Sequence, residues 1–521
     1  MDLEQLVLAL SKLKTKSNQR INKVKRKFCR EKNISMPGNA ELLSVYRKLI
    51  NANKLKQDTS LEQALQKRKI RTLSGVAPVA VLTKPYPCPG QCIYCPDEAK
   101  MPKSYLSNEP AVMRAVLTGF HPYKQVKARL KALENNGHNT EKIELIIMGG
   151  TWSYLPRQYQ NWFVRQCFNA CNHKKSTTLE KAQKLNETAK HRIVALTVET
   201  RPDYVDEQEI KYWRKLGATK VELGVQTLDD KILKLNKRGH TVKETIKATK
   251  LLKMAGFKIA YHMMPNLPGS TPTKDLQVYK KLFTDPKFQP DFVKIYPTVV
   301  TKNSILYRWW KQGKYKPYSD KQLFNLLLKI KLATPDRVRI IRLIRDIPGE
   351  SIIAGNKITN LRQNLQKELK KREQACQCIR CREAGENIKN IKQAQLFTEK
   401  YQASGAEEYF LQYCSKDKEK LYAFLRLRLP EPKEKNFIPE IDSCAMIREI
   451  HTYGRLIPLS SDKTKGVQHQ GFGRQLMKKT EEIAKKNNFE KIAVISGVGV
   501  RGYYRQLGYR RQGSYMIKKL K

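Results

Sequence analysis

The chain has 521 residues, 40% of them hydrophobic, which suffices for about three or four domains with buried cores and excludes global disorder. Lys and Arg number 101 against 48 Asp and Glu, so the formal net charge is +53. No apolar run reaches the roughly 18 residues of a membrane span, and the first residues lack the basic start of a secretory signal, so we expect a cytoplasmic protein without a membrane partner.

The excess of positive charge bears on the partner of the chain. Self-repulsion at +53 is large unless a polyanion neutralises it, so nucleic acid is the favoured partner. A solubilising surface, or a lineage rich in lysine, is the alternative. Charge alone does not distinguish RNA from DNA.

Residues 1–75 have a helical pattern and are strongly basic. Ten basic residues and one acid, Glu31, lie in the window from Lys12 to Lys32, whereas a solvated helix face normally mixes the two signs. We therefore predict a helical arm that contacts a polyanion. A basic tail without a defined ligand is the alternative.

Short apolar runs alternate with longer helical stretches over residues 76–345. Such alternation predicts an α/β fold with a parallel sheet, open or closed into a partial (β/α) barrel, and with its chemistry at the C-terminal ends of the strands. Helices are expected at residues 111–132 and 242–255. The predicted strands are residues 76–82, 143–148, 192–198, 220–225, 258–262 and 292–296.

Three cysteines follow the first predicted strand on one short loop. Cys88, Cys92 and Cys95 have the spacing C-x3-C-x2-C. A [4Fe–4S] cluster usually takes four cysteines, so three local thiolates would leave one iron open for a substrate. Zinc is the rival, but a structural zinc site usually has four ligands in paired CxxC units. Clustered cysteines without a secretion signal also indicate a reducing compartment rather than disulfides.

Four later strand ends carry candidate ligand-binding residues. Gly149 and Gly150 end the second predicted strand, Glu199 the third and Gln226 the fourth, and the segment 263–269 follows the fifth. Each break alone is weak evidence, because Gly–Gly and Pro–Gly are ordinary turn signals. Their repeated position at strand ends favours one shared site.

Two units follow the predicted barrel. Residues 346–395 form a charged connector with a second cysteine cluster, Cys376, Cys378 and Cys381. Residues 396–521 form a separate α/β domain, with strands at 422–429, 445–451 and 492–495 and a helix at 474–486. The resulting division is a basic arm at 1–75, a barrel at 76–345, a connector at 346–395 and a C-terminal domain at 396–521.

The helix at 474–486 is preceded by the sequence QHQGFG at 468–473. The pattern Q-x-x-G-x-G between a strand and a helix resembles the acetyl-CoA site of GNAT-type acetyltransferases, where backbone N–H groups at the helix start face the pyrophosphate. That resemblance assigns Gln470, Gly471 and Phe472 to the cofactor. It also implies that Tyr504 points its hydroxyl at the CoA sulfur, whereas a core role for Tyr503 or Tyr504 is the alternative.

In the same fold the strand before the helix pairs its backbone with the pantetheine arm. The resemblance therefore implies acetyl-CoA contacts along one strand, at Ile447, Arg448, Glu449 and Ile450. An apolar core strand without ligand contact is the alternative.

The two halves together resemble the catalytic subunit of Elongator and its single-chain archaeal and bacterial relatives. In that family a radical S-adenosylmethionine (SAM) barrel precedes an acetyltransferase domain. The resemblance covers about residue 65 to the C-terminus. The matching strings are RTLSGVA at 71–77, EPAVMRA at 109–115, IMGGT at 147–151, ETRPD at 199–203, RGHTV at 238–242, YHMMP at 261–265, QHQGFG at 468–473, KIAVISGVG at 491–499 and YYR at 503–505.

The resemblance implies an enzyme that converts the wobble uridine of tRNA to 5-carboxymethyluridine with a SAM-derived radical and acetyl-CoA. It implies a [4Fe–4S] cluster on the first cysteine triad, SAM against the barrel strand ends, and a structural zinc ion on the second triad, whose fourth ligand the sequence does not identify. It also implies that Lys142 contacts acetyl-CoA and acts with Tyr504 in catalysis. The expected partners are the tRNA anticodon stem-loop, an electron donor and, in a homodimer, a second copy of the chain.

The sequence departs from the family pattern in two segments, and two other functions are alternatives. The segment PDEAK after Cys95 and the segment KSYLS at 103–107 differ from the relatives' patterns, which puts local substrate geometry in doubt. The chain could instead be a protein lysine acetyltransferase, or a tRNA-binding subunit with a vestigial radical centre. The intact cysteine triad and the charge favour the tRNA-modifying enzyme, because protein acetyl transfer needs neither.

Overall fold

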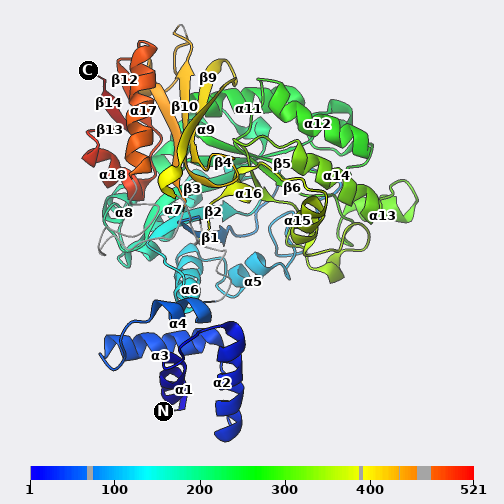
Figure 1. Ribbon diagram of the computed structural model, residues 1–521. Helices are drawn as coiled ribbons and strands as arrows, with labels where there is room; N and C mark the ends of the chain where they lie inside the picture. Colours follow the sequence, from blue (N-terminus) through cyan, green and yellow to red (C-terminus); the bar gives the residue numbers. More distant parts are fainter. Residues whose placement is uncertain (1, 67–73, 386–390, 433, 454–470, 521) are drawn as a thin grey trace.

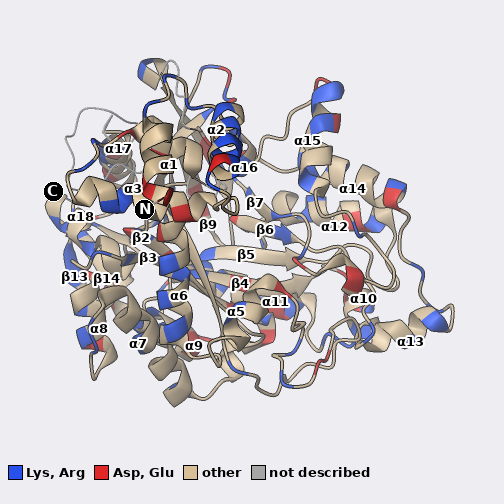
Figure 2. Cartoon of the chain, turned by 90° about the horizontal axis from the view of Figure 1, so that it is seen from below, with Lys and Arg blue, Asp and Glu red and all other residues tan. Residues whose placement is uncertain are grey.

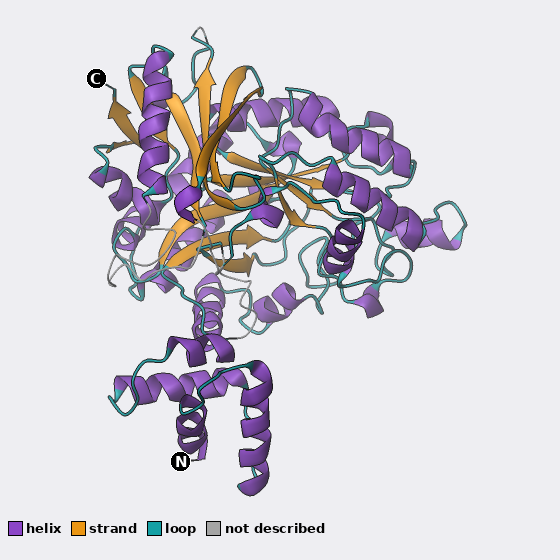
Figure 3. Ribbon diagram, viewed as in Figure 1, coloured by secondary structure: helices purple, strands orange, loops and turns teal. Residues whose placement is uncertain are grey.

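The computed structural model describes residues 2–66, 74–385, 391–432, 434–453 and 471–520. It contains an N-terminal group of helices and two seven-stranded sheets (Figures 1 and 3). No helix among these residues combines the length and the hydropathy that crossing a bilayer requires.

Four helices at the N-terminus enclose a small core of their own. They are α1 (Asp2–Ser11), α2 (Asn18–Glu31), α3 (Asn39–Asn51) and α4 (Thr59–Leu65), and they project from the body of the molecule in Figure 1. Leu6, Leu42 and Leu61 are fully buried between them. The Arg47 guanidinium donates a hydrogen bond to the Glu134 carbonyl, which joins this helical group to the barrel.

The first sheet confirms the predicted parallel sheet of a partial barrel. All of its strands are parallel, and neighbours in the sheet are neighbours in sequence, from β1 to β7. The strands are β1 (Ala77–Leu82), β2 (Lys142–Met148), β3 (Arg192–Thr200), β4 (Lys220–Gln226), β5 (Lys258–Met263), β6 (Phe292–Ile295) and β7 (Arg339–Arg342). The sequence prediction lacked β7, because a four-residue strand with an arginine at each end has no apolar run.

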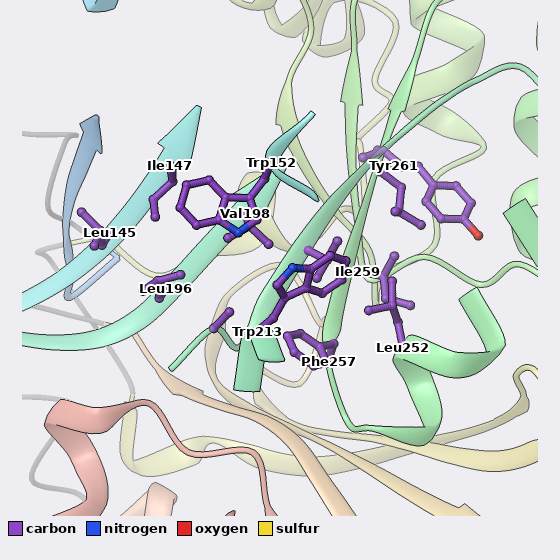
Figure 4. Packing of buried hydrophobic residues seen from close by; sticks show 14 of the residues in the cluster. Leu145, Ile147, Trp152, Leu196, Val198, Trp213, Leu252, Phe257, Ile259 and Tyr261 are labelled. Carbon is purple, nitrogen blue, oxygen red and sulfur yellow. The ribbon is translucent and has the colours of Figure 1, made fainter. Parts of the chain in front are cut away.

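Helices cover the outer face of this sheet, and the inner face lines a cavity. On β2, Ile143, Leu145 and Ile147 are buried toward the helices, whereas Lys142 and Glu144 face the cavity. Figure 4 shows aromatic and branched side chains packed on the outer side. The helices that contribute to this core include α7 (Arg157–Asn172), α8 (Leu179–Asn186), α9 (Glu207–Leu216), α11 (Val242–Met254), α12 (Pro272–Thr284), α14 (Asp320–Leu332) and α15 (Leu361–Lys371). Helices α10 (Asp230–Leu235) and α13 (Ile305–Lys311) pack in the cluster around the cysteine loop, and α16 (Ile379–Arg382) packs in the core of the second sheet.

The prediction of one helix over residues 111–132 was wrong. The structure has two helices there, α5 (Pro110–Val116) and α6 (Pro122–Asn135). Gly119 and Phe120 adopt positive φ angles of 58° and 56°, which end the first helix. Pro122 then starts the second, because its missing N–H and fixed φ suit the first turn of a helix.

The second sheet is mixed and follows the order β13-β14-β12-β11-β10-β9-β8. Its strands are β8 (Gln395–Gln402), β9 (Ala406–Cys414), β10 (Leu421–Pro430), β11 (Ala445–Thr452), β12 (Lys491–Val494), β13 (Arg510–Gln512) and β14 (Tyr515–Lys519). Among the described strands of this sheet, only β11 and β12 pair in parallel. Helices α17 (Phe472–Lys486) and α18 (Arg501–Gln506) complete the unit, and residues 454–470 lie outside the described chain.

Candidate active site

A cavity of about 2210 Å³ extends from the cysteine loop after β1 to the second sheet. The described residues that line it include Cys88, Cys92 and Cys95 in the barrel and Tyr503 and Tyr504 on α18. The two regions that the sequence assigned to radical chemistry and to acetyl-CoA therefore face one continuous space.

The cysteine loop is held by backbone hydrogen bonds from other loops of the barrel. The Ile93 N–H donates to the Asn236 carbonyl at 3.3 Å, and the Ile93 carbonyl accepts from the Leu306 N–H at 2.8 Å. Among the described residues, the sulfurs of the second cysteine cluster all lie within 4.8 Å of one another, but those of the first cluster do not form such a group. A cluster does not require its thiolates to converge on one point, because each of its irons takes one thiolate, whereas a single ion needs converging ligands.

Two buried arginines place N–H donors beside the cysteine loop. The Arg238 Nη1 lies 3.4 Å from the Cys92 Sγ, and its Nε donates to the Gly224 carbonyl at 3.2 Å. A hydrogen bond with Cys95 and the charge of Arg238 hold the pKa of the Cys92 thiol well below its ordinary value. The Nη1 of Arg201 is buried without a partner in the described structure, and a side chain at Gly90 would collide with it. This donor set fits an anionic iron–sulfur cluster.

We expect that Arg238→Met lowers the midpoint reduction potential of a reconstituted cluster. Removing a positive charge about 4 Å away disfavours the added electron by on the order of 100 mV, at an effective dielectric of about 20. A redox titration followed by electron paramagnetic resonance measures the potential directly. Arg238→Lys keeps the positive charge, so its midpoint potential should lie closer to that of the wild type than to that of Arg238→Met. Equal midpoint potentials in wild type and Arg238→Met would contradict the prediction.

Three of the four predicted residues at the barrel strand ends line the cavity, namely Gly150, Glu199 and Gln226. The Glu199 carboxylate accepts a hydrogen bond from Tyr105 at 3.0 Å. The Gln226 Oε1 is buried without a partner among the described residues, so it can accept a hydrogen bond from a ligand. Gly149 has a φ of 129° and no room for a side chain beside Thr83, which lets the turn form.

The sequence analysis missed an ionic cluster inside the barrel. The His262 Nε2 lies 2.9 Å from the Glu222 Oε2, and the Lys294 ammonium contacts both Glu222 and Glu199. Burial raises the pKa of Glu222, but the charges of Lys294 and Lys220 outweigh it and hold that pKa well below the ordinary value. Charged residues at inward positions of otherwise apolar strands were the signal that could have found this cluster.

The second sheet opens beside the predicted acetyl-CoA residues. Strands β11 and β12 pair only over residues 445–447 and 492–494 of the described chain, and β11 then runs along the cavity. Arg448, Glu449 and Ile450 line the cavity, whereas Ile447 is fully buried. The Arg448 side chain forms ion pairs inside the protein, which leaves its backbone as the part available to a cofactor.

Residues at the start of α17 and on α18 lie at the same opening. Gly471 lines the cavity and has a φ of 74°. The Phe472 ring stacks on Tyr413, with centroids 4.6 Å apart, and the predicted ligand Gln470 lies outside the described residues. Tyr504 is 5% exposed, and burial raises the pKa of its hydroxyl, so that hydroxyl stays protonated as a hydrogen-bond donor.

Lys142 lies at the N-terminal end of β2 and lines the cavity. Its ammonium forms no ion pair with any residue that the structure describes. Burial, with a smaller effect of Arg192, lowers its pKa. An unpaired ammonium that is costly to bury fits a site for an anionic ligand.

A buried ionic network fastens the second sheet to the barrel. Arg448 of β11 contacts the Asp291 carboxylate at 3.0 Å and the Glu408 carboxylate at 2.8 Å, and the Lys253 ammonium lies 3.1 Å from Glu408. Because these side chains are buried, removing one partner would leave an uncompensated charge. The network fixes β11 relative to the barrel strands.

The three cysteines of the second cluster are not among the residues that line the cavity. The sulfurs of Cys376, Cys378 and Cys381 lie within 4.8 Å of one another, as ligands of one ion must. Zinc–sulfur bonds of about 2.3 Å place tetrahedral sulfurs roughly 3.8 Å apart, so the geometry fits zinc. No fourth Cys, His or carboxylate ligand belongs to this group in the described chain, and the Lys331 ammonium lies 3.5 Å from the Cys381 Sγ.

Comparison with known proteins first defines the class. Residues 86–282 match the family model of the radical SAM superfamily, and residues 290–371 match that of the radical SAM C-terminal domain. The chain is therefore a radical SAM protein, and membership of that superfamily implies a [4Fe–4S] cluster and SAM.

Individual relatives then define the family. The chain is 44% identical to the tRNA uridine(34) acetyltransferase of Methanocaldococcus infernus, over 99% of this chain and 98% of the relative. It is 38% identical to Elongator complex protein 3 of Homo sapiens, over 88% of this chain and 86% of the relative. The solved structure of the Methanocaldococcus infernus Elp3 with an N-terminal deletion (1-46) has a TM-score of 0.75 and 44% identity, covering 86% of this chain and 100% of that chain. The chain belongs to this family, which confirms the resemblance inferred from its motifs.

Proposed function

We propose that the chain modifies the wobble uridine of tRNA, using a SAM-derived radical and acetyl-CoA to form 5-carboxymethyluridine. The observation that carries the proposal is the cavity that both the cysteine loop and Tyr504 line. Hydrogen abstraction needs reacting atoms about 3–3.5 Å apart, so both substrates must reach one space. The names of the relatives, which specify tRNA uridine(34), support the same function. A protein acetyltransferase would have no use for the cysteine triad in this cavity.

In the proposed reaction the cluster and SAM, when bound, supply the radical, and the residues of this chain hold the substrates. Glu199 and Gln226 would accept hydrogen bonds from bound SAM, and the N–H groups at the start of α17 would face the CoA pyrophosphate. The Lys142 ammonium would form an ion pair with a CoA phosphate. The Tyr504 hydroxyl would donate a hydrogen bond to the CoA sulfur. We propose that the domain that carries Tyr504 is of the GNAT type.

Mass spectrometry of tRNA nucleosides tests the proposed function. The chain is incubated anaerobically with tRNA, SAM, acetyl-CoA and a chemical reductant in place of the electron donor. We expect 5-carboxymethyluridine at the wobble position only when all four are present. A sample that binds tRNA and cleaves SAM but leaves the uridine unchanged would contradict the proposal.

We propose a structural zinc ion on Cys376, Cys378 and Cys381, supported by their converging sulfurs. Elemental analysis of the purified chain should find about one zinc per chain, and the Cys378→Ser variant should lose it. Zinc-free wild type, folded and with a full iron content, would exclude the ion.

The proposed tRNA contact of the N-terminal arm concerns the exposed face of α2. Figure 2 shows Lys and Arg gathered along this helix. Its exposed basic residues are Arg20, Lys23, Arg26, Lys27 and Arg30. Two residues of the predicted basic window are used within the protein instead, because Lys25 is buried against Asn39 and Lys16 pairs with Asp58 at 2.7 Å.

We expect that changing Arg20, Lys23, Arg26 and Lys27 to Gln weakens tRNA binding and flattens its salt dependence. Each lost phosphate contact reduces the slope of log K against log salt by roughly 0.7–0.9, so four contacts change it by about 3. Binding isotherms at several salt concentrations measure the slope.

A matched control removes the same charge elsewhere. Lys174, Lys175, Lys181 and Lys184 are exposed around the start of α8, and their change to Gln should leave most of the slope intact. Equal slopes for both fourfold variants would show that net charge, rather than the arm, determines binding.

A further inference from the structure

Helix α13 stands beside the cysteine loop, a few residues along the chain from a residue that lines the cavity. Thr301 lines the cavity, and the helix begins four residues later, at Ile305. The Leu306 N–H donates to the Ile93 carbonyl at 2.8 Å, and the Asp97 N–H donates to the Asn303 carbonyl at 2.7 Å. The helix is thus anchored directly on the loop that carries the cysteines, and Figure 1 shows it at the outer edge of the molecule.

One side of α13 is fixed in a hydrophobic cluster, and its aromatic residues are left partly exposed. Leu306 is fully buried in the cluster that includes Cys92 and Ile93. Tyr307, Trp309 and Trp310 are only half-buried at its border. The rings of Tyr307 and Trp310 stack with centroids 6.0 Å apart and planes inclined by 22°. The helix therefore presents rigid aromatic surface to the solvent.

The same segment carries unneutralised positive charge. Residues 302–319 contain five basic residues and no acid: Lys302, Arg308, Lys311, Lys314 and Lys316. All five are exposed, and none forms an ion pair with a residue in the described part of the chain. The Lys311 ammonium lies 5.0 Å from the centre of the Tyr307 ring. A protein partner would normally avoid so much unpaired charge, whereas a polyanion with aromatic faces complements it.

We propose that α13 is a stacking platform for single-stranded RNA, namely the nucleotides next to the one that enters the cavity. This inference rests on the proposed function and deepens it. A base that reacts at the cysteine end of the cavity must leave its stack, so its neighbours in the strand would lie close to the cysteine loop, on which α13 is anchored. The parts of the tryptophan and tyrosine rings that remain exposed can stack on these bases, and the basic side chains can contact their phosphates.

The test compares two RNAs and four variants of the full chain. The RNAs are an anticodon stem-loop carrying 2-aminopurine beside the wobble uridine, and a fully paired duplex of equal length. Trp310→Ala should weaken stem-loop binding about tenfold and remove the quenching of 2-aminopurine, because a stacked base is lost, while duplex binding stays unchanged. Trp310→Phe keeps a ring and should retain most of both signals.

Two further variants serve as controls. One changes only exposed charged side chains, so a folding defect is not expected, and the other removes an aromatic ring far from α13 in the sequence. Arg308→Gln with Lys311→Gln alters only exposed side chains and should lower the salt slope by about 1 to 2. Phe397→Ala is the matched control, since Phe397 is another half-buried ring with a lysine, Lys418, 4.6 Å from its centre, but it lies on β8. It should leave stem-loop binding and quenching unchanged.

The outcomes separate the platform from the proposed function. Wild type that fails to bind the stem-loop would overturn the proposed function itself. Wild type that binds and modifies tRNA, with unchanged affinity and quenching in Trp310→Ala, would overturn only the platform and leave α13 as a surface for another protein. Equal losses for stem-loop and duplex would also overturn the platform, because they would show no preference for unpaired bases.

Discussion

Replacing any one of Cys88, Cys92 and Cys95 with Ala should abolish SAM cleavage. The three thiolates would hold the implied cluster, and with only three local ligands one iron would be left open for SAM. If one thiolate is missing, another iron besides the open one would lack a protein ligand. The cluster would then not assemble beside Arg238. We therefore expect no detectable 5′-deoxyadenosine from any single variant, measured by chromatography after anaerobic incubation with SAM and a reductant.

Iron content and activity together distinguish ligation from a general loss of structure. Cys171→Ala is a suitable control, because Cys171 is fully buried on α7 and lies outside the cavity. It should keep both its iron and its 5′-deoxyadenosine production. A triple Ala variant of the loop that still held a full complement of iron would refute the assignment of the cluster to these residues.

The cysteine loop could be recognised from sequence because its three cysteines lie within eight residues of chain. The strand order of the first sheet was also accessible, since each βαβ unit is local and its right-handed crossover leaves few arrangements. The ionic cluster of Glu222, His262 and Lys294 was not, because it forms only when three strands become neighbours. The same holds for the network of Arg448, which the sequence assigned to acetyl-CoA and whose side chain the structure places between the two sheets.

Helix α13 shows why a surface is harder to predict than a loop of ligands. Its sequence, ILYRWWK, is typical of an ordinary amphipathic helix with a buried aromatic face. Only the structure shows that Leu306 takes the buried position, that the rings of Tyr307 and Trp310 remain at the border, and that the cysteine loop is adjacent. The functional interpretation depends on that position and not on the composition of the helix.

Acetyl-CoA hydrolysis should be slow without tRNA and should rise when tRNA is added. The thioester must reach the part of the cavity where the radical forms, and an unguarded radical or thioester would react with water or protein, so tRNA binding should control access. Lys142→Ala and Tyr504→Phe should each lower the tRNA-stimulated rate by roughly 10- to 100-fold, the effect of losing a hydrogen bond to a charged group or a reacting sulfur. Phe is preferred at position 504, because Ala would open a cavity at a residue that is 5% exposed.

Affinity for tRNA is the second measurement, and it decides what Lys142 and Tyr504 do. Neither residue is proposed to contact RNA, so both variants should bind tRNA within about twofold of wild type, well below the tenfold that 1.4 kcal/mol represents. Lys190→Ala is the control, since Lys190 is 73% exposed near the start of β3 and should change neither quantity. Hydrolysis that runs equally fast without tRNA would end the gating hypothesis. Wild-type hydrolysis by Lys142→Ala would remove Lys142 from the acetyl-CoA site, and the unpaired ammonium on β2 would then need a different anionic ligand.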